Sequence, residues 1–311
     1  MKLFGKVKKY IADKDYRISV NRYLGLYNIL SDKMFLKFIF RWKMKRNLDL
    51  DNPQTFNEKI QWLKINDRRP EYKIIVDKCA AKKVISEIIG EQYVIPTIGV
   101  YEKFSEINFE VLPDKFVLKC THDSGGLVIC KDKSTLNKAE AKNKINKSLR
   151  KNYYWHGREW PYKGVPHRIL CEEYIEDSNG ELNDYKFFCF DGLVDCVMVV
   201  ADRQKDNAKF YYMSREWKVL PYGRLTRSLP DDFTLPKPEK LDEMFQIAEK
   251  LSKGFPHVRI DLYNVDGRIL FGEYTLYSQS GLEDGFDYAS DKHLGDLIVL
   301  PSNDKRKIKE N

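Results

Sequence analysis

The chain has few of the features that mark disulfide-rich, zinc-binding or membrane-spanning proteins. Its six cysteines form no CxxC pair, and no histidine stands at zinc-finger spacing from them. We therefore expect reduced thiols, buried in or beside strands. No uninterrupted apolar run approaches the ~20 residues that a spanning helix needs, and no signal peptide is visible. These absences favour a cytoplasmic protein.

The composition is that of an ordered protein with an excess of positive charge. Its 311 residues are 42% hydrophobic and 32% charged, which is enough for two or three subdomains with a sizeable core. The formal charge of +8 favours an anionic partner such as a nucleotide or an acidic glycan. Lys and Arg are spread along the whole chain, so we do not expect nucleic acid as the partner.

One basic and strongly apolar stretch, residues 34–46, has two interpretations. It is either a helix that packs into the core, or an interfacial helix that brings the protein to the inner face of a membrane. The sequence alone leaves both open.

Periodicity predicts an α+β protein with a mostly helical N-terminal region at residues 1–110, in which Thr55 and Glu58 form a capping box. A lid subdomain at 111–175 and a C-terminal subdomain at 176–301 contain the strands, and 302–311 is a charged tail. A helix is expected at about 239–253, and a hairpin at 258–277 is expected to end the folded part. The other expected elements are strands at 116–120, 127–131, 168–175, 184–190 and 193–201 and a helix at 135–151.

The C-terminal hairpin carries the most informative polar pattern. Arg259 and Asp261 alternate with apolar residues on one strand, and Glu273 and Thr275 share a face of the other. A regular two-residue turn would put Asp261 and Glu273 on opposite faces, and only an odd-length loop or a bulge brings both carboxylates to one side. A three-residue loop ending in a left-handed Gly267 would pair Asp261 with Phe271 and Arg259 with Glu273, so that all four polar groups converge. Mg²⁺ would relieve the repulsion of the two carboxylates; ordinary surface salt bridges are the alternative.

The order of motifs along residues 70–285 resembles the D-alanine–D-alanine ligases and the wider ATP-grasp superfamily, whose fold is two α+β subdomains that grip ATP. The motifs are Val76-Asp-Lys78, Val94-Ile-Pro-Thr97, Phe116-Val-Leu-Lys119, the loop Thr121–Gly126, Cys171-Glu-Glu-Tyr-Ile175 and the hairpin. More narrowly, Asn52–Leu63, Asp77-Lys78, Gly272–Thr275 and Ser280-Gly281 resemble the TupA-like branch, which is associated with bacterial cell-surface polysaccharides, including teichuronopeptide.

The resemblance implies a site for ATP and Mg²⁺. Lys78 and Lys119 would hold phosphates, and Ser124, Gly125 and Gly126 would fold over them. Glu172 or Glu173, with Tyr174 and Ile175, would contact adenine. The remaining implied roles are ribose binding by Asp184, phosphate binding by Arg203, transition-state stabilisation by Arg259 and Lys119, and metal binding by Asp261, Glu273 and Thr275.

The resemblance also implies a reaction. A carboxylate–amine ligase would form an acyl phosphate and then an amide, with ADP and phosphate as the other products. The branch points to an amino acid or other small amine and to an acidic sugar or glycan containing uronic acid. Two alternatives remain: a kinase that phosphorylates a sugar hydroxyl, and a non-catalytic nucleotide-binding component of a polysaccharide assembly machine.

Overall fold

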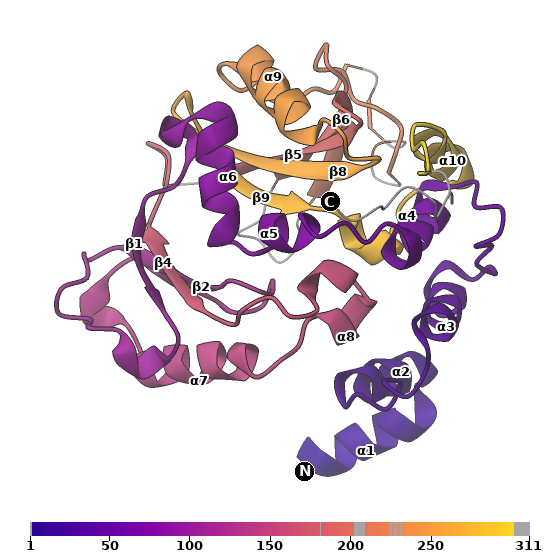
Figure 1. The fold of residues 1–311 in the computed structure, drawn as a ribbon, viewed down its shortest axis with the longest axis horizontal. Helices are drawn as coiled ribbons and strands as arrows, with labels where there is room; N and C mark the ends of the chain where they lie inside the picture. Colours follow the sequence, from indigo (N-terminus) through magenta and orange to yellow (C-terminus); the bar gives the residue numbers. More distant parts are fainter. Residues whose placement is uncertain are drawn as a thin grey trace, which may run out of the picture.

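The computed structural model describes residues 2–180, 182–201, 209–223, 226, 229–230 and 232–301. Within them, two antiparallel sheets form two lobes, with helices on their outer faces (Figure 1). The smaller sheet has the order β1-β4-β2-β3 and the larger has the order β7-β6-β5-β8-β9. This arrangement confirms the α+β class.

The smaller sheet consists of β1 (Thr97–Tyr101), β2 (Phe116–Cys120), β3 (Leu127–Cys130) and β4 (Ile169–Glu173). Helix α7 (Lys138–Leu149) packs on it through Ala141 and Ile145, which join a separate apolar core with Phe116 and Leu118. β1 pairs with β4, so the sheet begins at Thr97. Thr97–Tyr101 therefore belong to this sheet and not to the helical region in which the sequence placed them, while the lid boundary at 111 stays a prediction.

The larger sheet consists of β5 (Asn183–Phe190), β6 (Leu193–Ala201), β7 (Lys209–Met213), β8 (Val258–Val265) and β9 (Arg268–Thr275). Helix α9 (Leu241–Ser252) covers one face, where Phe245 meets Phe187 edge to face at 5.3 Å between ring centroids. The hairpin does not end the fold, because α10 (Tyr288–Asp296) follows it and packs against α4. The tail at 302–311 lies outside the described residues. All six cysteines are free, and Cys79 alone of them is not fully buried.

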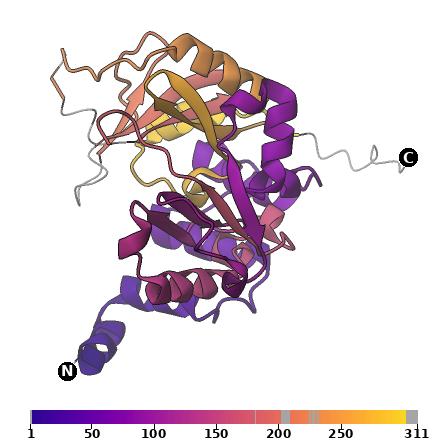
Figure 2. The ribbon, with the colours of Figure 1, turned by 90° about the vertical axis from the view of Figure 1, so that its left-hand side faces the viewer.

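The N-terminal region supplies α1 (Lys2–Ala12), α2 (Lys14–Tyr23), α3 (Asp32–Met44), α4 (Phe56–Asn66), α5 (Tyr72–Val76) and α6 (Ala80–Ile89). Figure 2 shows α1 projecting from the body. Four apolar side chains of α3 are buried in the main core: Phe35, Leu36, Ile39 and Phe40. Most of the apolar face at 34–46 is thus used within the fold, and membrane contact there stays a prediction. Among the described residues no helix is long and apolar enough to cross a bilayer.

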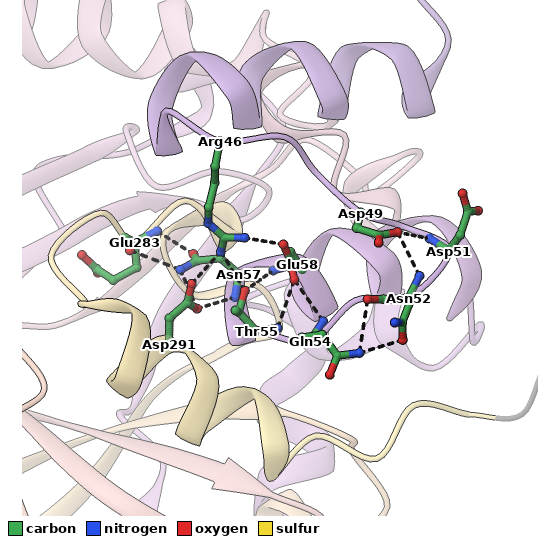
Figure 3. A network of polar contacts seen from close by, with 10 residues as sticks. All are labelled: Arg46, Asp49, Asp51, Asn52, Gln54, Thr55, Asn57, Glu58, Glu283 and Asp291. Carbon is green, nitrogen blue, oxygen red and sulfur yellow. Dashed lines mark hydrogen bonds and ion pairs between the residues drawn. The ribbon is translucent and has the colours of Figure 1, made fainter.

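Polar residues at the start of α4 form a network of hydrogen bonds and ion pairs that joins α4 to α10 (Figure 3). The Thr55 hydroxyl accepts the Glu58 backbone N–H at 3.4 Å, and the Glu58 carboxylate accepts the Thr55 N–H at 3.1 Å, which confirms the capping box. Arg46 bridges Glu58 and Asp291, and both the backbone and the side-chain amide of Asn57 donate to Asp291 at 2.9 Å. These residues therefore serve the packing of the two helices.

The same helix holds the segment that follows β9. The side-chain amide of Gln61 donates to the Gly281 carbonyl at 2.6 Å. Lys64, fully buried, donates to the Ser280 hydroxyl at 2.7 Å and to the Gly157 carbonyl at 3.0 Å. Ser280 has a positive φ of 57°, an unfavourable conformation that these contacts support. Gln61 and Ser280-Gly281, which stand far apart in the sequence, thus form one structural unit.

Candidate functional site

A small cleft with a cavity volume of about 30 Å³ lies between the two lobes, lined by residues from strands of both sheets. The polar side chains on its walls are Lys78, Lys82, Lys119, Glu172 and Glu273. Four of these five are residues that the sequence assigned to the site, so segments separated by almost 200 positions do converge. The apolar part of the lining is Ile75, Val76, Ala81, Val94, Ile95, Tyr162, Phe271 and Tyr274.

Three lysines give this cleft a positive charge. Lys119 and Lys82 both bind Glu172, at 2.7 Å and 2.5 Å between Nζ and the carboxylate oxygens. Burial opposes ionisation of Glu172, but the two lysine charges outweigh it and hold the pKa of that carboxyl below its usual range. Three lysine charges and the Glu172 and Glu273 carboxylates leave a net +1 on these walls. Such a cleft attracts phosphate groups.

In strand β4, only one of the two consecutive glutamates faces the cleft. Glu172 is buried and lines it, whereas Glu173 is exposed. Beyond the strand, the Tyr174 hydroxyl donates to Glu176 at 2.9 Å, and Lys115 lies over the Tyr174 ring. Tyr174 is engaged by these neighbours, and Ile175 is half-buried beside it.

The loop Thr121–Gly126 lies at one end of the cleft. Lys78 donates to the Asp123 carbonyl at 2.6 Å, which ties the loop to the N-terminal region. The Gly126 N–H donates to the Asp123 carboxylate at 3.0 Å, and a Cβ on Gly126 would lie 2.4 Å from the Cys120 sulfur. Gly126 is therefore required by close packing, while Ser124 and Gly125 are exposed at the tip, where their backbone can reach a ligand.

The hairpin brings the two acidic residues together in a way that differs from the expected one. The turn is Asp266-Gly267, with φ values of 50° and 77°, and Val265 pairs with Arg268. The expected positive φ at Gly267 is confirmed, but the expected three-residue loop is wrong. A bulge shifts the register between Asp261 and Leu262, so that Asp261 pairs with Glu273.

Buried ion pairs hold Asp261 in place. The Arg259 guanidinium donates two bonds to its carboxylate, at 2.6 Å and 2.8 Å, and Lys186 donates a third. Burial opposes ionisation of Asp261, but Arg259 and Lys186 hold the pKa of its carboxyl below the usual range. Lys186 also binds Asp184 at 2.6 Å, so Asp184 belongs to this buried cluster.

The outer members of the cluster are less constrained. Thr275 accepts a bond from Arg259 at 3.0 Å, so its hydroxyl is used within the hairpin. The Glu273 carboxylate lies 3.7 Å from the Arg259 guanidinium, and its side chain is 42% exposed and lines the cleft. Arg203 lies outside the described residues.

Two basic residues of the site were missed by sequence reasoning. Lys82 follows Lys78 by four positions and Lys186 follows Asp184 by two, so each lies on the same face of its segment as the neighbour. Those spacings were the available signal. Neither spacing reveals the partner, because Lys82 binds a residue ninety positions away.

The donor set fits Mg²⁺ that arrives with a nucleotide rather than a closed metal site. Within the described residues, no three or more His, Cys, Asp or Glu side chains gather around one point. Asp261 and Glu273 nevertheless face each other across the hairpin, and Glu273 is accessible. Mg²⁺ in nucleotide sites takes one or two carboxylates and completes its shell with phosphates and water.

A family model for TupA-like ATP-grasp proteins matches residues 58–299. The chain belongs to the TupA-like ATP-grasp family. This membership confirms the ATP-grasp fold of two α+β lobes, and it covers every motif of the cleft and the hairpin. The comparison with curated proteins found no match to this chain.

Solved structures similar to this TupA-like protein include several ATP-grasp ligases. D-alanine–D-alanine ligase from Bacillus anthracis, complexed with ATP, is 17% identical, with a TM-score of 0.41 over 72% of this chain and 63% of that one. The same ligase from Helicobacter pylori is 14% identical, with a TM-score of 0.40 over 80% and 70%. D-cycloserine synthetase DcsG is 13% identical, with a TM-score of 0.41 over 73% and 70%. The chain thus spans less than two thirds of the first ligase's length.

Proposed function

We propose that this protein is an ATP-dependent ligase that joins a carboxylate to an amine. The observation that carries the proposal is one cleft whose walls hold three lysines and Glu273, with Asp261 directly opposite Glu273. Lysines suit the phosphates of ATP as strong donors and point charges. The family is named for the ATP-grasp fold, which supports a nucleotide in this position.

The side chains would divide the work as follows. Lys78, Lys82 and Lys119 would offset phosphate charge, and Glu172 would keep two of these lysines oriented. Asp261 and Glu273 would hold Mg²⁺, which supplies a Lewis acid for the phosphate oxygens. Arg259 fixes the Asp261 carboxylate by two hydrogen bonds, and a direct role beside the transferred phosphoryl group stays a prediction for it.

The reaction needs no nucleophile from the protein. An oxygen of the substrate carboxylate attacks the γ-phosphorus, the bond between that phosphorus and the β–γ bridging oxygen breaks, and ADP leaves. The amine nitrogen then attacks the acyl carbon of the acyl phosphate, phosphate leaves and the nitrogen loses a proton. Positioning and charge stabilisation account for such catalysis, and closure of the smaller lobe would exclude water from the acyl phosphate.

The proposed substrates are a uronic-acid sugar or glycan and an amino acid. The resemblance to the TupA-like branch implies a role with cell-surface polysaccharides, and a formal charge of +8 suits an acidic glycan. The bond formed would join the acyl carbon of the first substrate to the amine nitrogen of the second.

The test is ADP release with uronic acids crossed against amino acids, with mass detection of the product. An amide appearing together with ADP and phosphate supports the proposal. A stable phosphorylated sugar instead would identify a kinase on the same scaffold. No ADP release from any combination, with ATP bound, would indicate a non-catalytic nucleotide-binding component.

A further inference from the structure

A second, larger cleft of about 750 Å³ lies beside the loop Thr121–Gly126. One wall is α7 and the segment that leads into α8 (Tyr154–Gly157); the other is the end of α2 and the turn after it. The exposed tip of the loop, Ser124 and Gly125, forms its floor together with Asp123. This cleft is distinct from the lysine-lined cleft described above.

Two links connect the clefts. Lys78, which lines the first, donates to the carbonyl of Asp123, which lines the second. Tyr162 of the first cleft also contacts Tyr153 of the second, with 4.8 Å between ring centroids. One short loop and one pair of aromatic rings thus join the linings of the two clefts. A group held in the second cleft next to Ser124 would be close to phosphates held in the first.

The wall formed by α7 is polar in a periodic way. Asn143, Asn146, Lys147 and Arg150 recur at helical spacing and all line the cleft. The opposite face of the helix, with Ala141 and Ile145, packs into the core of the smaller lobe. Amides both donate and accept hydrogen bonds, as hydroxyl groups require, while the two cations suit carboxylates.

Exposed aromatic rings complete the lining. Tyr23 is 65% exposed and Trp155 is 37% exposed, and both line the cleft. Lys147 and Lys151 lie over the Tyr23 ring, at 5.7 Å and 5.5 Å from its centroid. An aromatic face offers an apolar, electron-rich surface to the C–H face of a pyranose ring.

The charge of the lining selects for an acid. Four cations line the cleft, namely Arg22, Lys147, Arg150 and Lys151, and Asp123 is its carboxylate. The oxygens of Asp123 already accept bonds from the Gly126 N–H and the Ser148 hydroxyl. Arg22 donates to the His156 carbonyl, so Lys147, Arg150 and Lys151 are the cations that face the space most openly.

We propose that this second cleft is the binding site for the acidic saccharide, with its uronate carboxylate directed toward Ser124 and Gly125. The inference rests on the proposed function, because it assigns the carboxylate substrate of that reaction to a place. Amides and aromatic rings recognise the sugar, and Lys147, Arg150 and Lys151 recognise the other carboxylates of the glycan. The loop tip then presents the reacting carboxylate to the nucleotide cleft.

The test is calorimetric titration of the full chain with a galacturonate trisaccharide, and with maltotriose as the neutral counterpart, each in the presence of a non-hydrolysable ATP analogue. The variants are Lys147→Gln/Arg150→Gln and Tyr23→Ala. The matched control is Lys142→Gln/Lys144→Gln, which removes two exposed charges from the same helix outside the cleft. Affinity for the ATP analogue is measured in every variant.

The wild type is expected to bind the galacturonate trisaccharide and to bind maltotriose at least tenfold more weakly. Lys147→Gln/Arg150→Gln should weaken galacturonate binding by at least about tenfold, which is the loss of one charge-assisted hydrogen bond. Tyr23→Ala should weaken both saccharides, while the control and the affinity for the ATP analogue stay unchanged.

Equal weakening by the cleft variant and the control would overturn the assignment, since it would mean attraction to the helix as a whole. Absence of galacturonate binding to a protein that binds the ATP analogue would overturn it as well. Neither result touches the ligase proposal, which depends on ADP release and product mass. Conversely, galacturonate binding without ADP release would retain the saccharide site and reject the ligase.

Discussion

Asp261 and Glu273 are direct cross-strand neighbours, although the two-residue turn between their strands would by itself put them on opposite faces. The bulge that corrects the register adds Gly272 to β9. A Cβ on Gly272 would lie 3.0 Å from the Asp261 carbonyl oxygen and 3.1 Å from the Tyr263 ring. Glycine permits this close approach, which a side chain would crowd. The geometry of the acidic pair therefore depends on a residue with no side chain.

Gly272→Ala should accordingly disturb both stability and activity. We expect a loss of about 1–3 kcal/mol in the free energy of unfolding, from crowding of a packed strand, and reduced Mg²⁺-dependent ADP release. Gly5→Ala is the control, because nothing lies within 4 Å of the added Cβ. Denaturant unfolding measures the stability of both variants, and an ADP-release assay measures their activity. A Gly272→Ala protein as stable and as active as the wild type would show that the bulge does not need glycine.

The bulge also shows what the sequence could reveal. Strand alternation and the Asp266-Gly267 turn were readable, and glycine within a strand is a known sign of a bulge. Strands with strong apolar runs, such as Phe116–Cys120, were located closely. β1 was missed because it is short and mostly half-exposed, so its pattern is weak. The partners of Lys82 and Lys186 could not be derived, because they depend on how the sheets meet.

The two acidic residues should differ in what their neutral variants do to stability. Asp261→Asn and Glu273→Gln should each abolish Mg²⁺-dependent ADP release, because each removes a charged oxygen ligand. Glu273 is 42% exposed, so Glu273→Gln should leave the thermal midpoint nearly unchanged. Asp261→Asn leaves the buried cations Arg259 and Lys186 without their shared anion, which should cost roughly 3–5 kcal/mol.

Activity assays and thermal melts on the same preparations separate these effects. Of the two variants, only Glu273→Gln is thus expected to leave the fold intact. Normal Mg²⁺-dependent ADP release from Glu273→Gln would remove the metal assignment, since that protein remains folded.

The lysines of the cleft should contribute to nucleotide affinity. Lys119→Met and Lys82→Met should each weaken ATP binding by about tenfold or more, as expected for a lost charge-assisted contact to phosphate. Lys78→Met should do likewise. Lys83→Met is a matched control, because Lys83 neighbours Lys82 but is exposed and lies 3.9 Å from Glu87.

Calorimetry with ATP and Mg²⁺ measures these affinities. Lys82 and Lys119 bind the same carboxylate, so their double variant should deviate from additivity. If all three cleft variants bind ATP as tightly as Lys83→Met does, the phosphates bind elsewhere.

The buried imidazole of His257 should make the protein sensitive to mild acid. Burial lowers the pKa of His257 to about 3, and its Nδ1 lies 3.0 Å from the Cys189 carbonyl oxygen. Between pH 6.5 and pH 3 the unfolded chain binds a proton that the folded protein excludes, so stability present above pH 6.5 is lost as the pH falls through this window.

From pH 7 to pH 5 the single group His257 should remove about 2 kcal/mol from the free energy of unfolding. His257→Gln should therefore flatten the pH dependence of denaturant unfolding over that interval. The comparison is of slopes, because the variant also loses packing against Phe56 and Phe190 at every pH. A slope equal to that of the wild type would mean that the folded protein admits the proton to His257.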